Sequence, residues 1–195
     1  RQPLEDGKLT ISRAAMSLEF PCDFMLLASM NPCPCGYHGA PSGQGENRRE
    51  CNCAPQLIQK YRAKISGPLL DRIDIHLTVP AVAYEKLAEA RQGESSKNIR
   101  ERVVRARQVQ EQRFHNSSSS NNSGMNRKEL ETHAELADSS RKILQQAMTK
   151  MGLSARAYDR ILKVARTIAD LAGEQKIDTP HVAEAIQYRN LDRPV

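Results

Sequence analysis

Phe24-Met25-Leu26-Leu27-Ala28-Ser29-Met30-Asn31 is a short apolar run that ends on a polar amide. Further along the chain, Leu69-Leu70-Asp71-Arg72 and Gly152-Leu153-Ser154-Ala155-Arg156 each end on an arginine. In this order the three segments offer one amide and two cations, Asn31, Arg72 and Arg156, to a nucleotide phosphate. The sequence contains no G-x-x-x-x-G-K-[ST] phosphate loop. We therefore expect the second half of a phosphate-handling machine, whose first half would lie upstream.

The composition predicts a soluble protein with a helical tendency. Hydrophobic residues make up 39% of the 195 residues and aromatic residues 4%, without Trp. No apolar run approaches the roughly 18 residues that span a bilayer, and the N-terminus lacks a signal-peptide pattern. We thus expect a cytoplasmic protein with no membrane partner. The net charge of +6 and the pI near 9.2 fit either an ordinary surface or a polyanionic partner.

The first region, residues 1–92, mixes strand-like runs with Pro and Gly. Lys8 to Ser12 and Ser17 to Phe20 predict a hairpin. Phe24 to Ala28 predicts a buried parallel strand, and the alternation from Ile73 to Val79 predicts another strand. Pro55 to Ile65 reads as a helix with Pro in its first turn.

The second region, residues 96–195, has a helical pattern almost throughout, and the boundary near Gly93 to Ser96 is the expected hinge. The expected helices run over 96–114, 126–136, 139–151, 154–172 and 179–190. Their apolar spacing predicts a small bundle. His115 to Gly124 is rich in Asn and Ser, and we expect a flexible loop that buries no core. Arg166 is expected to be structural or on the surface.

A longer set of motifs carries a resemblance. The run Leu26-Leu27-Ala28-Ser29-Met30-Asn31-Pro32-Cys33-Pro34-Cys35-Gly36, followed by Ser66-Gly67-Pro68-Leu69-Leu70-Asp71-Arg72-Ile73-Asp74-Ile75-His76, resembles the magnesium-chelatase-like AAA+ ATPases, and within them the ComM/YifB branch. The resemblance covers nearly the whole chain but only the C-terminal part of such proteins. It implies an α/β plus all-α fold: residues 1–92 as the C-terminal half of an AAA+ P-loop core, and residues 96–195 as its helical lid.

The resemblance implies a role for each phosphate-directed residue. Asn31 matches sensor 1, which orients the attacking water beside the γ-phosphate, although an Asn before Pro is also a common turn residue. Arg72 matches the arginine finger that reaches the nucleotide of a neighbouring subunit, although a surface ion pair is the plainer interpretation. Arg156 matches sensor 2 in the lid, with Arg160 as the alternative candidate. ATP with Mg²⁺ and self-association into a ring, a hexamer in the parent protein, are implied as well.

The hairpin is similar to the pre-sensor-1 hairpin that the family shares with MCM-type replicative helicases. The similarity places Arg13 on a lysine that holds the nucleic-acid backbone, and we expect Arg13 and Lys8 to contact DNA phosphates. Such contacts carry no sequence information. A solvated hairpin charge is the alternative.

Four of the five cysteines form two C-x-C pairs, Cys33 with Cys35 and Cys51 with Cys53. Four thiolates satisfy a tetrahedral structural Zn²⁺ and leave no position open for catalysis. C-x-C is tighter than the usual C-x₂₋₄-C spacing, so free thiols, or a disulfide under oxidising conditions, remain alternatives.

Three functions follow from these features. The first is part of an ATP-driven ring motor acting on DNA, a branch-migration helicase or translocase, whose parent chain hydrolyses ATP while residues 1–195 alone do not. The second is an ATP-driven remodeller of a protein partner, like the motor subunit of magnesium chelatase. The third is a non-catalytic, zinc-stapled interaction module.

Overall fold

The structure is a computed structural model that describes residues 2–13, 16–39, 50–79 and 93–189. The chain divides into two compact units, Arg1–Ile73 and Asp74–Val195. Each unit is described by itself below.

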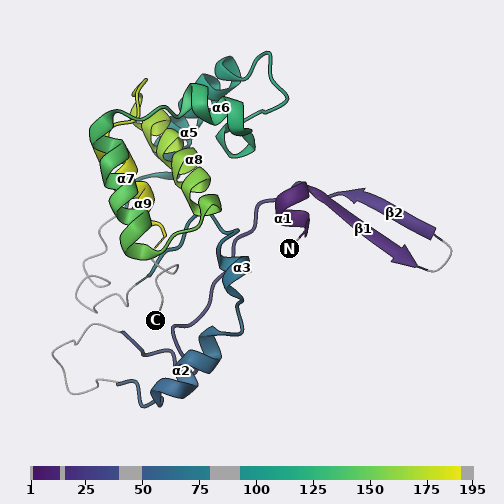
Figure 1. The fold of residues 1–195 in the computed structure, drawn as a ribbon, viewed down its shortest axis with the longest axis vertical. Coiled ribbons are helices and arrows are strands. Elements are labelled where there is room, and N and C mark those ends of the chain that lie inside the picture. Colours follow the sequence, from purple (N-terminus) through teal and green to yellow (C-terminus); the bar gives the residue numbers. More distant parts are fainter. Residues whose placement is uncertain (1, 14–15, 40–49, 80–92, 190–195) are drawn as a thin grey trace. The chain divides into compact units, whose positions relative to one another are not determined.

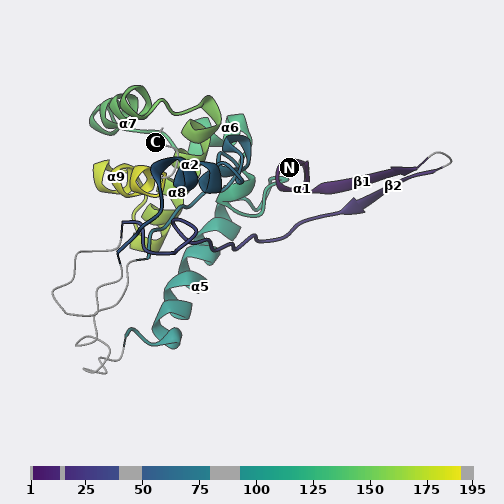
Figure 2. The same cartoon turned by 90° about the horizontal axis from the view of Figure 1, so that it is seen from below.

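The first unit opens with a hairpin. Helix α1 (Gln2–Asp6) leads through Gly7, which adopts a positive φ of 62°, into strand β1 (Lys8–Arg13). Strand β2 (Met16–Pro21) pairs with β1 in antiparallel register, from Lys8 opposite Pro21 to Arg13 opposite Met16. Figure 2 shows the two strands as an extended ribbon beyond α1. The hairpin predicted from the alternating pattern is confirmed.

Two short helices complete the described part of this unit. Helix α2 (Pro55–Arg62) starts with Pro at its first turn, where the missing N–H has no intrahelical partner to lose. Helix α3 (Gly67–Leu70) is a single turn that ends two residues before Arg72. Helix α2 confirms the helix expected from Pro55, although it ends three residues earlier than predicted, at Arg62.

The predicted parallel strand from Phe24 to Ala28 is not formed. This segment is extended without strand pairing, and Met25 and Leu27 are each 91% exposed. A strand needs a neighbour for its backbone N–H and C=O groups, and the sheet of the described residues contains only β1 and β2. The prediction of a buried strand is therefore wrong for this segment, because the described residues offer no sheet for it to join.

The strand predicted from Ile73 to Val79 is also absent from the described residues. Leu77 is 66% exposed and Val79 85%, whereas His76 is buried. The backbone N–H of His76 donates to the carbonyl of Tyr188 over 2.7 Å. The polar residue His76 is therefore buried, whereas the apolar residues Leu77 and Val79, which the pattern predicts to be buried, are exposed.

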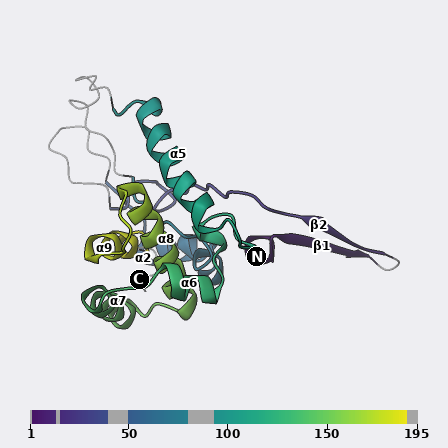
Figure 3. The ribbon, with the colours of Figure 1, turned by 90° about the horizontal axis from the view of Figure 1, so that it is seen from above.

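The second unit is a helical bundle, as predicted. It contains α5 (Ser96–Arg113), a 3₁₀ turn η1 (Asn122–Gly124), α6 (Arg127–His133), α7 (Asp138–Met151), α8 (Ala155–Ala172) and α9 (Thr179–Gln187). Helix α8 packs against α9, α5, η1 and α6, and α7 packs against α9 (Figure 1). Figure 3 shows the first half of α5 running out beyond the other helices, and residues 96–105 are all exposed.

The core of the bundle forms because α8 repeats apolar side chains every three or four residues. Ile161, Ala165 and Ala169 are each 0% exposed. Leu162 of α8 also belongs to the core. The remaining core side chains come from other parts of the unit: Phe114, Met125, Leu130, Ala134, Leu136, Leu144, Ile177, Val182 and Ala185. No helix of the described ranges is both long and apolar enough to cross a bilayer.

Local sequence signals set the helix ends. Ser95 and Ser154 cap α5 and α8 by accepting hydrogen bonds from Asn98 N–H and Ala157 N–H. Gly152 and Gly173 end α7 and α8 with φ of 62° and 78°, conformations that favour glycine. Asn126 and Glu129 form a reciprocal capping box at α6.

The Asn/Ser-rich segment before α6 differs from expectation. It was predicted to be a flexible loop, but Asn122 at its end is only 1% exposed. Its side chain lies in a hydrogen-bonded network with charged groups of α5 and α8. A composition argument fails here because one buried amide with several partners orders the segment without apolar residues.

Candidate nucleotide and metal sites

The four predicted cysteine ligands lie together. The sulfur of Cys33 is 3.2 Å from that of Cys35 and 3.7 Å from that of Cys51. Cys35 and Cys51 are 3.6 Å apart, and with Cys53 all four sulfurs lie within 4.8 Å of one another. All five cysteines lie in the described ranges, and all are free thiols. Four thiolates around zinc at 2.3 Å would be about 3.8 Å apart, so the cluster has the size of a tetrahedral metal site.

The cluster also favours ionisation of one thiol. Burial disfavours the Cys33 thiolate, but hydrogen bonds from Cys35, from the backbone of His38 and from Cys51 outweigh it and lower the Cys33 pKa to about 6. The pKa of Cys51 is raised to about 12: a backbone hydrogen bond at Cys53 opposes this rise, while burial and the neighbouring thiols cause it. A metal ion binds cysteine as the thiolate, so binding of a metal at this site would release protons from the thiols.

Asn31 lies next to the cysteine cluster. Its side chain is exposed, and it precedes the buried Cys33 by two residues. Gly36 turns the chain back with φ of 85°, and a Cβ at Gly36 would lie 3.9 Å from Cγ of Asn31. On the other side, Nε of Arg62 in α2 donates to the carbonyl of Pro32 over 3.2 Å. The turn that holds Asn31 thus contacts both the cysteine cluster and α2.

Arg72 follows α3 and is mostly buried. Its side chain is 9% exposed, and Nη2 lies 2.7 Å from Oε2 of Glu5. Nη1 donates to the carbonyl of Pro68, and Nε is buried without a hydrogen-bond partner in the described ranges. Glu5 lies 67 residues away from Arg72 in sequence. No local pattern could have predicted this pair.

Arg156 and Arg160 lie in the first turns of α8, in the second unit. Arg156 is exposed at the second helical position after the Ser154 cap. Arg160 is paired with Asp74 through its Nη1. The structure therefore leaves Arg156 as the more accessible of the two sensor 2 candidates. Asn31 and Arg72 belong to the first unit and Arg156 to the second.

The two hairpin cations are not brought together. Lys8 begins β1 and Arg13 ends it, about 17 Å away at the usual rise of a strand. Lys8 is paired with Glu19 at 2.7 Å, and this carboxylate raises the Lys8 pKa. Arg13 lies opposite Met16 at the far end, and both residues are exposed. Arg13 is the cation at the end of the hairpin that lies farthest from α1.

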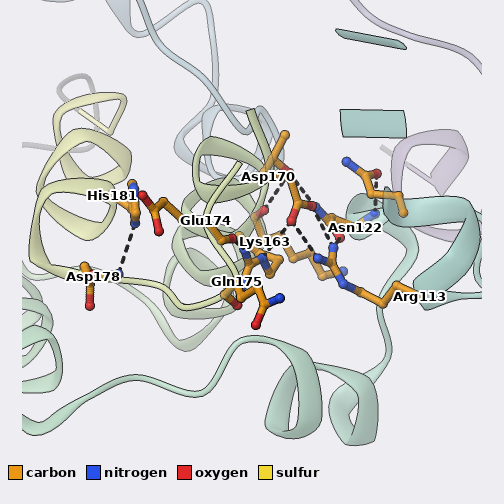
Figure 4. A network of polar contacts seen from close by, with 11 residues as sticks. Arg113, Asn122, Lys163, Asp170, Glu174, Gln175, Asp178 and His181 are labelled. Carbon is orange, nitrogen blue, oxygen red and sulfur yellow. Dashed lines mark hydrogen bonds and ion pairs between the residues drawn. The ribbon is translucent and has the colours of Figure 1, made fainter. Parts of the chain in front are cut away.

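A buried polar network in the second unit escaped the sequence reasoning. Arg113 of α5 donates from both Nη atoms to the two oxygens of Asp170 in α8, each over 2.6 Å. Nδ2 of Asn122 donates to Oδ2 of Asp170 over 2.8 Å, and Nη1 of Arg113 donates to Oδ1 of Asn122 over 2.7 Å. Figure 4 shows these three side chains turned toward one another. Only the spacing of Arg166 and Asp170, four residues apart on one helix, gave a hint of it in the sequence.

Arg166 extends this network and is structural, as expected. It is 2% exposed, and its Nε donates to Asp170 over 3.1 Å. Its two Nη atoms donate to the carbonyls of Glu174 and Gln175 at 2.6 and 2.8 Å. Burial lowers the Arg166 pKa, although Asp170 opposes this. Arg166 therefore fixes the chain where it leaves α8.

Family models match both parts of the chain. The model described as "Magnesium chelatase, subunit ChlI" matches residues 1–87, and "Magnesium chelatase, subunit ChlI C-terminal" matches residues 93–189. The chain belongs to the magnesium chelatase subunit ChlI family. Asn31, Arg72 and the four clustered cysteines lie in the first matched segment, and Arg156 lies in the C-terminal one.

Two relatives illustrate the range of the ChlI-like family. The chain is 43% identical to "Competence protein ComM" of Haemophilus influenzae over 194 residues, which cover 99% of this chain and 36% of that protein. It is 35% identical to the protein YifB of Salmonella typhimurium, again over 99% of this chain and 36% of that protein. The chain thus spans 36% of the length of the relatives it matches.

Proposed function

We propose that this chain is part of an ATP-driven ring motor that acts on DNA. The observation that carries the proposal is the ordered set Asn31, Arg72 and Arg156 in a chain of the ChlI family. Because the chain spans 36% of its relatives, the phosphate loop and the acidic Mg²⁺ ligands are proposed to lie in the part that it does not cover. The chain alone then does not hydrolyse ATP, because it lacks the groups that position the phosphates and Mg²⁺.

Each residue has a distinct task in the proposed mechanism. The Asn31 amide orients the attacking water, and Arg156 contacts the γ-phosphate from the helical lid. Arg72 comes from the neighbouring subunit and stabilises the charge that develops on the transferred phosphoryl group. The planar, permanently charged guanidinium suits this task. A finger that works between subunits implies a head-to-tail ring, and a hexamer is proposed.

The contacts of Arg72 are compatible with such a finger. The Glu5 carboxylate holds its Nη2 at 2.7 Å, in the way a phosphate oxygen would. The Nε lies buried without a hydrogen-bond partner in the described ranges, so the hydrogen-bonding capacity of the guanidinium is not fully used. The pair keeps the guanidinium in a fixed rotamer next to α3 rather than free in solvent.

DNA is the proposed substrate because of the charge and the hairpin. The net charge is +6. Every side chain of β1 and β2 is exposed, and Arg13 lies at the end of β1 away from α1. An exposed cation at a hairpin end suits non-specific contact with a phosphate backbone. Lys8 contributes less, because Glu19 neutralises it.

The cysteine cluster is proposed to hold one structural Zn²⁺, in addition to ATP and Mg²⁺ in the nucleotide site. The four sulfurs have the number, element and spacing for a tetrahedral thiolate site. All four positions around the metal would be filled by protein ligands, so the zinc has no part in the chemistry.

Hydrolysis of ATP by the full-length protein that carries this chain tests the proposed function. Its rate is measured without DNA, with single-stranded DNA and with branched DNA. The proposal predicts that DNA raises the rate and that Arg13→Gln reduces this rise. A rate that is indifferent to DNA would instead favour the second candidate, a protein remodeller, which the family description as a magnesium chelatase subunit supports.

A further inference from the structure

The part of the first unit around Asn31 has almost no hydrophobic core. Among its described residues only Cys33 and Ile58 are buried, with 0% and 8% exposure. Apolar side chains nearby are open to solvent: Met25 and Leu27 are each 91% exposed, and Leu57 is 49% exposed. Among the described residues, the turn that holds Asn31 is therefore kept in place mainly by the cysteine cluster and by its hydrogen bonds.

The cysteine cluster joins two segments that are separate in sequence. Cys33 and Cys35 lie two and four residues after Asn31, and Cys51 and Cys53 lie four and two residues before Pro55, where α2 begins. One ion bound by all four sulfurs would join the end of the extended segment to the start of a helix. The cluster thus closes a loop between Cys33 and Cys53, and closing a loop by a ligand bond stabilises the folded segment.

We propose that Zn²⁺ bound to Cys33, Cys35, Cys51 and Cys53 orders the described residues 31–39 and 50–62 and so positions the Asn31 amide. Its consequence for hydrolysis rests on the role proposed for Asn31 above. The cysteines are positioning residues, and the zinc acts on Asn31 through the turn at Gly36. A site of four thiolates is closed and supplies folding free energy directly.

Three contacts carry the effect from the cluster to Asn31. The N–H of Gly36 donates to the Cys33 carbonyl over 3.1 Å, which closes the turn between the first two thiols. This turn brings Gly36 against the Asn31 side chain, since a Cβ there would lie 3.9 Å from Cγ of Asn31. Arg62 of α2 holds the intervening Pro32 carbonyl at 3.2 Å. Release of the metal would free both ends of this arrangement.

The first experiment measures metal content and local order in the 195-residue chain. We expect one zinc per chain in the wild type, by elemental analysis, and a loss of most of it in Cys35→Ser and in Cys51→Ser. Cys22→Ser is the matched control, because Cys22 is a free thiol outside the cluster. A wild-type chain that takes up no zinc, or a Cys22→Ser chain that loses it equally, overturns the proposal.

A second measurement does not depend on whether the variants fold. In the wild-type chain, hydrogen exchange at the Gly36 amide is compared before chelation, after chelation and after Zn²⁺ is added back. We expect chelation to speed this exchange by at least about tenfold and added Zn²⁺ to restore it. The amides of α8, in the other unit, are the internal control and should not change. Unchanged exchange at Gly36 contradicts the folding role of the metal.

The positioning of Asn31 has its own readout. The side-chain NH₂ signal of Asn31, assigned by its disappearance in Asn31→Asp, should shift or broaden on chelation. An unchanged signal, together with faster exchange at Gly36, would overturn the link from zinc to Asn31. None of these three measurements involves ATP or DNA. The proposed motor function can therefore fail in its own assay without changing these results.

Discussion

Arg113 and Asp170 form a two-point ion pair that joins α5 to α8, with each Nη atom 2.6 Å from a different carboxylate oxygen. The Asp170 side chain is 1% exposed and that of Arg113 13%. Asn122 and Arg166 use the remaining capacity of the same carboxylate at 2.8 and 3.1 Å. These partners offset the desolvation penalty of the buried carboxylate, and removing one of them would destabilise the folded state strongly. The Asp170 carboxylate therefore joins α5, the turn η1 and α8 through its hydrogen bonds.

The charge of Asp170 should make the bundle sensitive to acid. Burial opposes the ionised form, but hydrogen bonds from Arg113 and Asn122 outweigh it and lower the Asp170 pKa. The folded state thus binds fewer protons than the unfolded state, whose carboxyl titrates near about 3.9. The stabilisation is complete above that pH and is lost as the pH falls below it toward the folded pKa. We expect the free energy of unfolding, measured by urea and helical circular dichroism, to fall steeply there.

Asp170→Asn tests the source of this acid sensitivity. The change leaves two buried arginines without their counter-charge, so we expect a loss of about 3 kcal/mol at neutral pH. The same variant should lose much less stability on acidification than the wild type. Asp138→Asn is the matched control, because Asp138 is 89% exposed and lies 3.7 Å from Arg141. Equal acid sensitivity of Asp170→Asn and the wild type would contradict this assignment.

Asn122 should matter for stability although it lies in a segment of low complexity. Asn122→Ala removes hydrogen bonds to Arg113, Asp170 and Thr167 and leaves charged partners unsatisfied in the interior. We expect a loss of about 2 kcal/mol in the free energy of unfolding. Asn116→Ala, at an exposed position in the same segment, should change it by less than about 0.5 kcal/mol. Equal effects of the two substitutions would mean that the segment is no more than a solvated loop.

Arg13 should account for one phosphate contact in DNA binding. Neutralising it by Arg13→Gln is expected to lower the slope of log K against log salt by about 0.7 to 0.9, the value for one released counterion. Binding of the full-length protein to single-stranded DNA at several salt concentrations measures this slope. Arg127→Gln is the control, since Arg127 is an exposed cation already paired with Glu131 at 3.0 Å. An unchanged slope in Arg13→Gln removes Arg13 from the DNA contact.

Elements whose signals are local could be predicted from the sequence. The hairpin followed from alternation in Lys8 to Ser12, and α8 followed from the Ser154 cap, the apolar repeat and Gly173. The four cysteines were predicted from their number and pairing, and the structure brings their sulfurs within 4.8 Å. In each case the residues that decide the outcome are close in sequence or chemically unusual.

Elements that depend on distant partners could not be predicted in this way. The run from Phe24 to Ala28 has the composition of a buried strand, yet a strand forms only where a neighbouring strand pairs with it. The partners of Asn122 and Arg72 lie 48 and 67 residues away, at Asp170 and Glu5. Composition gave no sign of either pairing, because the partner residues are ordinary charged residues in their own segments.

The roles of Asn31 and Arg72 can be tested together in mixed rings. If Asn31 serves the nucleotide of its own subunit and Arg72 that of its neighbour, Asn31→Ala and Arg72→Ala each abolish hydrolysis by full-length rings. An arginine finger alone is worth about 10³-fold or more in rate. In a mixture, however, an Arg72→Ala pocket beside an Asn31→Ala neighbour regains both intact groups. Random assembly gives this arrangement at about a quarter of the interfaces.

The most direct measurement is therefore ATP hydrolysis by full-length rings assembled from equal amounts of Asn31→Ala and Arg72→Ala chains. The account predicts that the mixture hydrolyses ATP far faster than either variant alone, approaching about a quarter of the wild-type rate. A mixture as inactive as its two components would contradict it, because both residues would then serve one pocket from one chain or serve no pocket at all.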